Sequence, residues 1–178
     1  MNHLTGYSLF LILLAALSGT IQAEYKTQPC DIEFNGLKLC SVNKNGHAIS
    51  AELLMKAIAD DEKQLISITI KRDGKTHKLE ISPDVTVLAG DIGDIRFNDI
   101  NFDGIPDTSI TTSFGAPNLY LDYWVYIPES KSYQKLGNYS VFELDPKTKT
   151  ISTMTKINAA SYKNVKYKWD GYKLVETQ

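Results

Sequence analysis

Turn-forming dipeptides recur along this chain between runs in which apolar and polar residues alternate. Asn35-Gly36, Asp73-Gly74 and Asp170-Gly171 each lie between two such runs. Asn-Gly and Asp-Gly favour the two-residue turns of β-hairpins, because these residues tolerate a positive φ. A chain with this punctuation is expected to fold mainly as antiparallel hairpins.

The runs between the turns alternate as β-strands do. In Leu119–Ile127 the odd-numbered positions are apolar and would share one face, whereas the even-numbered positions from Tyr120 to Tyr126 would take the other. Further strands are expected at Leu65–Ile70, His77–Ile81, Val85–Leu88, Ile95–Phe97, Thr108–Ser113, Tyr133–Leu136, Thr150–Thr155, Lys166–Trp169 and Tyr172–Val175.

One segment, Ile49–Asp60, fits two kinds of structure. Leu53, Leu54, Ala57 and Ile58 would share a helical face, but the neighbouring runs make a strand an equal alternative. Strands at nearly regular spacing with little helix predict a mainly β fold. We expect antiparallel hairpins in one compact domain over residues 24–178, propeller-like or sandwich-like in arrangement.

The N-terminal segment has the order of an export signal. Leu9–Leu17 is uncharged and apolar, but shorter than the roughly 20 residues that span a membrane. Small residues follow it and end at Ala23, a suitable cleavage site. Residues 1–23 are therefore predicted to be a signal peptide, with a periplasmic or secreted mature chain and no stable membrane insertion. Because no Lys or Arg precedes the apolar run, an uncleaved anchor is the alternative.

The two cysteines favour a disulfide, since exported chains meet an oxidising environment. Between Cys30 and Cys40 the nine residues form two extended pieces around Asn35-Gly36, a turn that would bring the sulfur atoms together. Two free buried thiols are the alternative.

Oxygen-bearing side chains recur in Asp99–Asp107, here called the acidic loop. They occupy positions 1, 3, 5 and 9, and Gly104 at position 6 allows a sharp turn. Calcium takes about six to eight oxygen ligands in loose geometry, which such a curled backbone can supply. The expected calcium ligands are Asp99, Asn101, Asp103, Asp107 and the carbonyl of Ile105.

The surroundings of the acidic loop do not fit a calcium switch. Ile110 stands at the twelfth position in place of Glu, and no amphipathic helix flanks the loop. The loop resembles the Asp-x-Asn-x-Asp-Gly-x-x-Asp turns of FG-GAP-type β-propellers, in which the ion pins a hairpin. Without an ion the three carboxylates would repel one another, so calcium is expected to stabilise the fold. A metal-free Asp/Asn-rich turn is the alternative.

Charge is nearly balanced overall, with 19 basic and 21 acidic residues, which argues against a nucleic-acid partner. Its distribution is uneven, because residues 84–129 hold eight acids and one base, whereas residues 130–178 hold nine lysines and four acids. This suggests a cation site in the middle and an anionic or carboxylate-rich partner for the basic tail. Ordinary solvated strand faces would explain the tail equally well.

Three motifs in Ile95–Val175 resemble those of a family of exported bacterial β proteins. They are Arg96-Phe97-Asn-Asp99 leading into Asn101-Phe102-Asp103-Gly104, then Tyr123-Trp124-Val-Tyr126-Ile-Pro128, then Tyr167-Lys168-Trp169-Asp170-Gly171-Tyr-Lys-Leu174. The family includes immunity proteins that neutralise peptidoglycan hydrolases delivered by type IV secretion. Its members are similar in structure to periplasmic inhibitors of invertebrate-type lysozyme. The resemblance covers about half of the mature chain and leaves residues 24–94 aside.

The resemblance implies an inhibitory loop. In the lysozyme inhibitors a Tyr-x-x-x-Lys motif enters the hydrolase cleft, and Tyr162 and Lys166 have that spacing. A Lys can pair with the catalytic carboxylates of a glycosidase, and a Tyr can stack where a sugar would sit. The companion Ser-Gly-x-Tyr loop has only a distant counterpart in Leu136–Tyr139. A chance match on a surface strand is the alternative.

Catalytic motifs are lacking, so the chain is not expected to be an enzyme. His47 and His77 belong to no nucleophile or zinc pattern and are expected as exposed turn residues. Trp124 and Trp169 are expected to pack in strands, with sugar platforms as the alternative.

Three functions follow in order of preference. The first is a calcium-stabilised inhibitor or immunity protein, whose protein partner is a cell-wall glycoside hydrolase or lysozyme. The second is a calcium-pinned structural or adhesion module of the cell envelope. The third is a hydrolase that uses an acid such as Asp122 or Glu143.

Overall fold

The computed structural model describes residues 30–37, 40–114, 118–158 and 160–177. These residues form fifteen β-strands and no helix, which confirms the mainly β prediction. The predicted signal peptide, residues 1–23, lies outside the described residues. Within the described ranges, no helix is long and apolar enough to cross a membrane.

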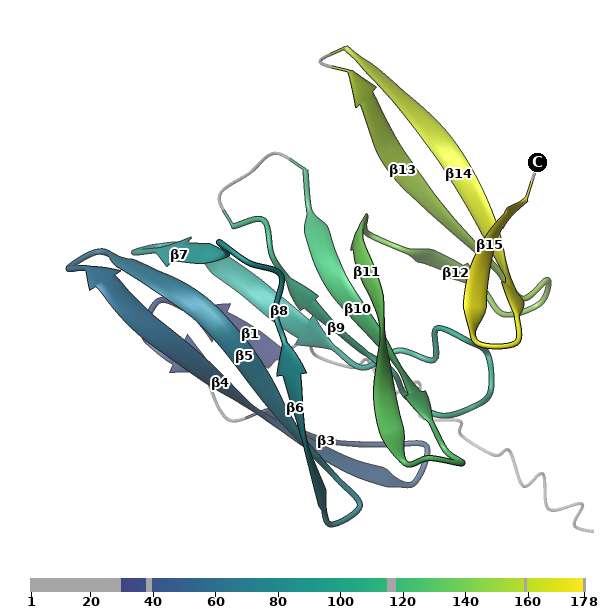
Figure 1. Ribbon diagram of the computed structural model, residues 1–178, viewed down its shortest axis with the longest axis horizontal. Coiled ribbons are helices and arrows are strands. Elements are labelled where there is room, and N and C mark those ends of the chain that lie inside the picture. Colours follow the sequence, from purple (N-terminus) through teal and green to yellow (C-terminus); the bar gives the residue numbers. More distant parts are fainter. Residues whose placement is uncertain (1–29, 38–39, 115–117, 159, 178) are drawn as a thin grey trace, which may run out of the picture.

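The strands form three antiparallel sheets (Figure 1). The central sheet has the order β11 (Ser132–Ser140), β10 (Tyr120–Ile127), β9 (Thr108–Thr111), β8 (Ile92–Arg96), β1 (Cys30–Glu33) and β2 (Gly36–Leu37). The N-terminal sheet has the order β3 (Cys40–Lys44), β4 (His47–Ala59), β5 (Glu62–Arg72) and β6 (Lys75–Glu80), with β7 (Thr86–Leu88) also paired to β5. The C-terminal sheet has the order β12 (Glu143–Asp145), β13 (Thr150–Asn158), β14 (Ser161–Asp170) and β15 (Lys173–Thr177).

The ambiguous segment 49–60 lies largely in β4. This strand pairs with β3 on one side and with β5 on the other, and it turns Ile49 and Ala51 into the core. Pairing on both sides therefore outweighs the helical preference of its Ala, Leu and Glu residues.

Tight turns connect many of the strands. The predicted Asp73-Gly74 turn is confirmed, because Arg72 pairs with Lys75 and both turn residues have positive φ, 49° and 78°. The Asn45-Gly46 turn between β3 and β4 has the same conformation, with φ of 52° and 82°, although the sequence expectations did not include it.

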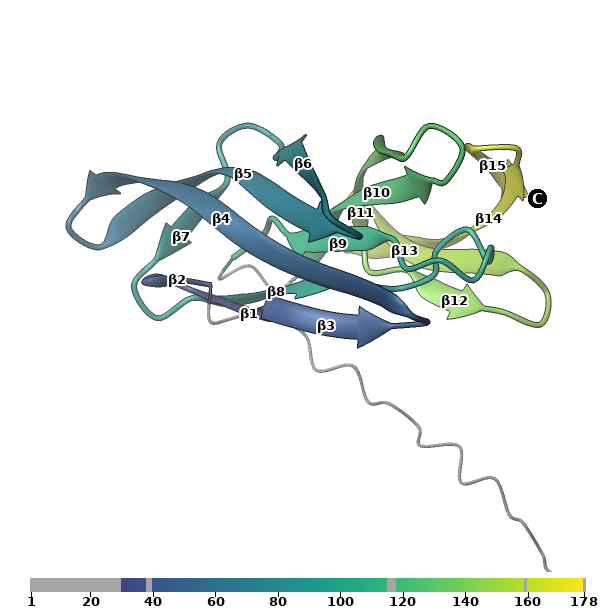
Figure 2. The same ribbon diagram turned by 90° about the horizontal axis from the view of Figure 1, so that it is seen from below.

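The central sheet packs against both other sheets, so it has a core on each face (Figures 1 and 2). Toward the N-terminal sheet, Ile110 and Trp124 join one buried cluster. Toward the C-terminal sheet, Leu121, Tyr123 and Val125 join another. Side chains that alternate along β10 therefore pack into two different cores. Trp124 is a core residue, as predicted. The sheets stack in layers and do not close around an axis, so the molecule is sandwich-like, not propeller-like.

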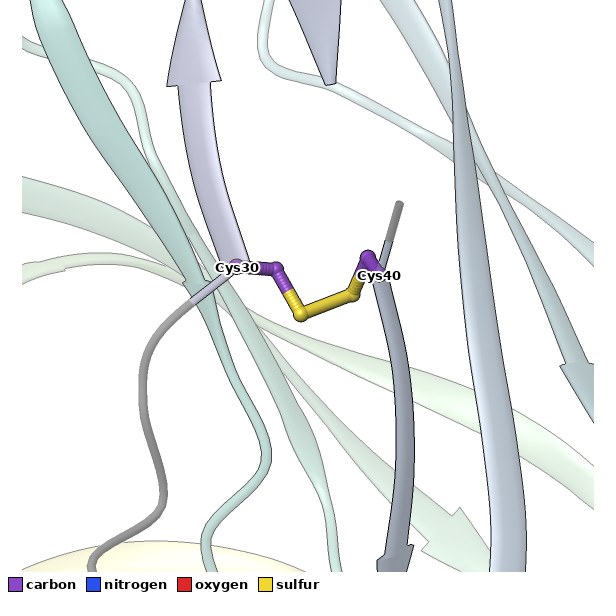
Figure 3. Close-up of a disulfide and its surroundings, with 2 residues drawn as sticks. All are labelled: Cys30 and Cys40. Atoms are coloured by element: carbon purple, nitrogen blue, oxygen red, sulfur yellow. A yellow bond between two sulfur atoms is a disulfide. The ribbon is translucent and has the colours of Figure 1, made fainter. Parts of the chain in front are cut away.

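The predicted disulfide is present, and it joins two sheets (Figure 3). Glu33 pairs with Gly36, which makes β1 and β2 a hairpin, but Cys40 lies beyond that hairpin at the start of β3. The bond between Cys30 and Cys40 therefore links the central sheet to the N-terminal sheet. Both residues belong to the buried cluster between these sheets.

Loss of the disulfide should destabilise this junction. Replacing Cys30 and Cys40 together with Ala is expected to lower the free energy of unfolding by about 2–3 kcal/mol, because a short covalent loop no longer restricts the unfolded chain. Urea unfolding with and without reductant measures the effect. Reductant should shift the wild-type midpoint and leave the double variant unchanged; a wild-type midpoint that reductant does not move would contradict the prediction.

Candidate functional site

The acidic loop connects β8 to β9 and has two residues with left-handed backbone. Gly104 has a φ of +86°, which agrees with the sharp turn expected there. Phe102 has a φ of +60°, a conformation that costs energy for an aromatic residue. Its ring packs against the cluster between the central and C-terminal sheets, and this packing holds the backbone in place.

Side-chain oxygens of the acidic loop bind the loop's own backbone. Asp99 accepts hydrogen bonds from the N–H groups of Asp103 at 3.0 Å and Gly104 at 2.9 Å. Asp103 in turn accepts one from the N–H of Ile105 at 2.7 Å, and the amide of Asn101 donates to Asp103 at 2.9 Å. The side chains of Asp99, Asn101 and Asp103 therefore lie on one curled segment, as the spacing predicts.

Asp107 has a different role from the other acids of the loop, because it is fully buried. One of its oxygens accepts hydrogen bonds from the N–H groups of Ile100 at 2.8 Å and Asn101 at 3.3 Å. The other accepts one from the N–H of Tyr126 at 2.8 Å, in β10. Burial raises the pKa of Asp107 to about 7, although these backbone N–H groups act in the opposite direction. Asp107 thus fixes both ends of the loop to the central sheet.

The other two sheets also hold the acidic loop. From the N-terminal sheet, Asn45 donates to the carbonyl of Gly104 at 2.8 Å, and the guanidinium of Arg72 donates to the carbonyl of Pro106. From the C-terminal sheet, the indole N–H of Trp169 donates to the carbonyl of Ile100 at 2.9 Å. The loop is consequently a junction at which all three sheets meet.

The loop's suitability for a metal ion can be judged from these contacts. Asp99, Asn101 and Asp103 are exposed or half-buried and offer the oxygen donors that calcium prefers. Asp107 shares its carboxylate among backbone N–H groups, and in the described part of the chain no three Asp, Glu, His or Cys side chains converge as a metal site. The residues fit calcium by donor type, and some of these oxygens would have to exchange a backbone N–H for the ion.

Asp122 lies in the interior and is not accessible to a substrate. Its exposed fraction is 0%, and its oxygens accept hydrogen bonds from the N–H and hydroxyl of Ser82, from Lys135 and from Asn138, at 2.6–2.9 Å. These contacts tie β10 and β11 to the end of β6. Glu143, the other acid considered for hydrolysis, is exposed on β12. Nothing in the spacing of Asp122 distinguishes it from a surface acid, so the sequence could not reveal this role.

The two histidines lie in different surroundings. His47 lies beside a turn, as expected, and its Nδ1 atom is 2.9 Å from a carboxylate oxygen of Asp73 in the neighbouring turn. His77, expected as an exposed turn residue, packs edge-on against Tyr126 and Tyr133, at ring distances of 6.1 and 5.2 Å. That expectation was wrong because His77 faces the central sheet.

Tyr162 and Lys166 both lie on β14 and are exposed. β12 pairs with β13 only over residues 150–152, and β15 pairs with β14 only over residues 166–170. The remainder of the β13–β14 hairpin pairs with no third strand of the described residues, and this two-stranded ribbon projects from the molecule (Figure 1). Tyr162 lies near the tip of this ribbon and Lys166 at its base.

A groove of ≈ 300 Å³ lies where the ribbon approaches the start of β10. The hydroxyl of Tyr162 donates to the side chain of Asn118 at 3.1 Å across it. The groove therefore combines an aromatic ring with amide and carboxylate groups. Its lining residues are Asn118, Leu119, Ser140, Val141, Glu143, Thr153, Met154, Tyr162 and Asn164.

Comparison of the chain with known protein families, with curated proteins and with solved structures yields no match.

Proposed function

We propose that this protein is an exported, calcium-stabilised binder and inhibitor of a cell-wall glycoside hydrolase or lysozyme. The observation that carries the proposal is the projecting ribbon, which presents Tyr162 near its tip, with Lys166 on the same strand where the ribbon joins the C-terminal sheet. A narrow two-stranded ribbon has a shape that can enter an enzyme cleft. The resemblance of its motifs to those of immunity proteins and lysozyme inhibitors supports the same function.

The surface of the ribbon supports a protein partner with an acidic cleft. Met154 and Ile157 leave 51% and 61% of their surface exposed, which provides apolar area for contact. Lys156, Lys166 and Lys168 are exposed and, among the described residues, make no ion pair. Glycosidases use a pair of carboxylates, so such lysines would complement their active site.

In this proposal calcium stabilises the fold and is not part of the surface that binds the hydrolase. The acidic loop gathers contacts from all three sheets, so an ion held by Asp99, Asn101 and Asp103 would strengthen a junction of the whole fold. A nearby cation would also favour the charged form of Asp107, which burial opposes.

Replacing Tyr162 and Lys166 with Ala should weaken binding of the target hydrolase about 30-fold or more, the effect of losing interface hot-spot residues. The assay measures affinity and residual hydrolysis against a panel of purified glycoside-type cell-wall hydrolases and lysozymes. A matched control changes Tyr172 and Lys147, also an exposed Tyr and Lys, and should bind like the wild type.

Two outcomes would count against the proposal in different ways. If the wild type neither binds nor inhibits any enzyme of the panel, the inhibitor function is lost. If it inhibits and the Tyr162/Lys166 variant inhibits equally well, only the assignment of the ribbon is lost.

A second candidate is a structural or adhesion module of the envelope, and the groove beside Tyr162 favours it. Aromatic, amide and carboxylate groups together are typical of surfaces that bind a sugar. This function predicts that Tyr162→Ala weakens binding to a cell-surface glycan and that the wild type leaves hydrolase activity unchanged.

A further inference from the structure

A buried arginine that pairs with no carboxylate of the described residues lies between the central and N-terminal sheets. Arg72 is the last residue of β5, and its exposed fraction is 1%. Its guanidinium carries a permanent charge, and removing such a charge from water is costly unless it is compensated. Among the described residues the guanidinium makes no ion pair, and its one hydrogen bond there goes to the carbonyl of Pro106.

Aromatic rings cover part of the guanidinium. The ring centre of Tyr126 lies 4.3 Å from the Arg72 Cζ atom, and that of Tyr133 lies 5.4 Å away. Cation–π contacts of this kind stabilise the guanidinium by less than the desolvation of a buried ion costs. They also leave the N–H groups at the edge of the guanidinium without acceptors.

Several other polar atoms around Arg72 are buried and make no hydrogen bond of good geometry to any residue that the structure describes. They belong to Thr108, Tyr133 and His77, which lie on β9, β11 and β6. Burial raises the pKa of Tyr133 to about 12, whereas the Arg72 guanidinium and the Thr108 hydroxyl act against this rise, so these groups are neighbours. We call Arg72, His77, Thr108, Tyr126 and Tyr133 the Arg72 cluster. Its unpartnered atoms are Arg72 Nε and Nη1, His77 Nε2, Thr108 Oγ1 and Tyr133 Oη.

All these unpartnered atoms can donate a hydrogen bond, given one tautomer of His77. Hydrogen-bond donors on groups that neighbour a buried positive charge are complementary to an anion, and the Asp107 carboxylate near Tyr133 is the negative charge with which that anion would compete. Water would also need acceptors for its own hydrogen atoms, and in the cluster only the hydroxyls and one imidazole tautomer could serve. Asp107 does not meet this need, because both its oxygens bind backbone N–H groups.

From this arrangement we propose that the Arg72 cluster holds a small monovalent anion of the chloride class. The anion would neutralise Arg72, accept hydrogen bonds from the cluster and connect the central sheet to the N-terminal sheet behind the acidic loop. This inference does not depend on the proposed function.

Bromide provides the direct test, because it binds like chloride and scatters anomalously. Crystals of the mature protein soaked in sodium bromide should give an anomalous peak within hydrogen-bonding distance of Arg72 Nε and Nη1. Electron density at that position without an anomalous signal would identify a water molecule and overturn the proposal. The absence of any electron density there would overturn it as well.

A solution measurement complements the crystal. Changing sodium gluconate to sodium chloride at equal ionic strength, with chelator present, should raise the melting temperature by about 3 °C, as expected for about 1 kcal/mol in a domain of this size. Arg72→Met keeps the stem and should abolish this rise, and Thr108→Val should reduce it if Arg72→Met does not fold. Arg96→Met removes an arginine that pairs with Asp94 and should keep the full rise. Equal melting of the wild type in both salts would overturn the proposal.

Discussion

Asp107→Asn should lower the free energy of unfolding by about 3–4 kcal/mol, even with calcium removed by a chelator. The carboxylate of Asp107 accepts hydrogen bonds from Ile100, Asn101 and Tyr126, and the side chain is fully buried. The amide of Asn has one oxygen, so its NH₂ group would face a backbone N–H. At least one buried donor then loses its partner, and the loop is no longer fixed to β10.

Chemical denaturation of the two proteins in chelator measures this effect. Asp84→Asn is the matched control, because Asp84 is exposed and has a φ of 62°, which Asn also tolerates. The control should change stability by less than about 0.5 kcal/mol. An Asp107→Asn protein as stable as the control would show that the buried carboxylate does not hold the loop.

Asp122→Ala should cost about 3–5 kcal/mol, the range for breaking a buried, hydrogen-bonded ion pair. The change removes the carboxylate that Lys135 approaches at 2.9 Å and leaves Ser82 and Asn138 without their acceptor. The ammonium of Lys135 is partly exposed, so water recovers part of the loss and favours the lower end of the range.

The measurement is again denaturant unfolding, with Glu143→Ala as the control. Glu143 is an exposed acid with one weak contact to Ser152, so its loss should be nearly neutral. If Asp122→Ala left the fold intact but abolished turnover of cell-wall glycan, Asp122 would be catalytic and the structural role assigned to it would be wrong.

The mainly β character was predictable because strand alternation and tight turns are local properties of the sequence. The Asp73-Gly74 turn and most strands between residues 65 and 175 follow from such patterns. The disulfide was predictable from the cysteine count, but its geometry was not. Cys40 starts a strand of another sheet, and no local pattern specifies the sheet that a strand joins.

The layered arrangement and the buried polar residues could not be predicted, because both arise from contacts between distant segments. Alternation in Tyr120–Ile127 indicates two faces, but not that each face meets a different sheet. Arg72 and Asp122 look like surface residues in the sequence, yet both are buried. In the acidic loop, spacing predicts the curled segment, whereas the use of Asp107 as an anchor to Tyr126 depends on the tertiary fold.

The most direct test of calcium stabilisation at this junction is thermal melting of the wild type and of Asp103→Ala, each with calcium and with chelator. Binding at a hundred times the dissociation constant contributes about 2.7 kcal/mol, so calcium should raise the wild-type melting temperature by roughly 5–10 °C. Asp103→Ala removes a proposed ligand that is exposed to solvent, and should melt at the same temperature in both conditions. Equal melting of the wild type with calcium and with chelator would contradict the account.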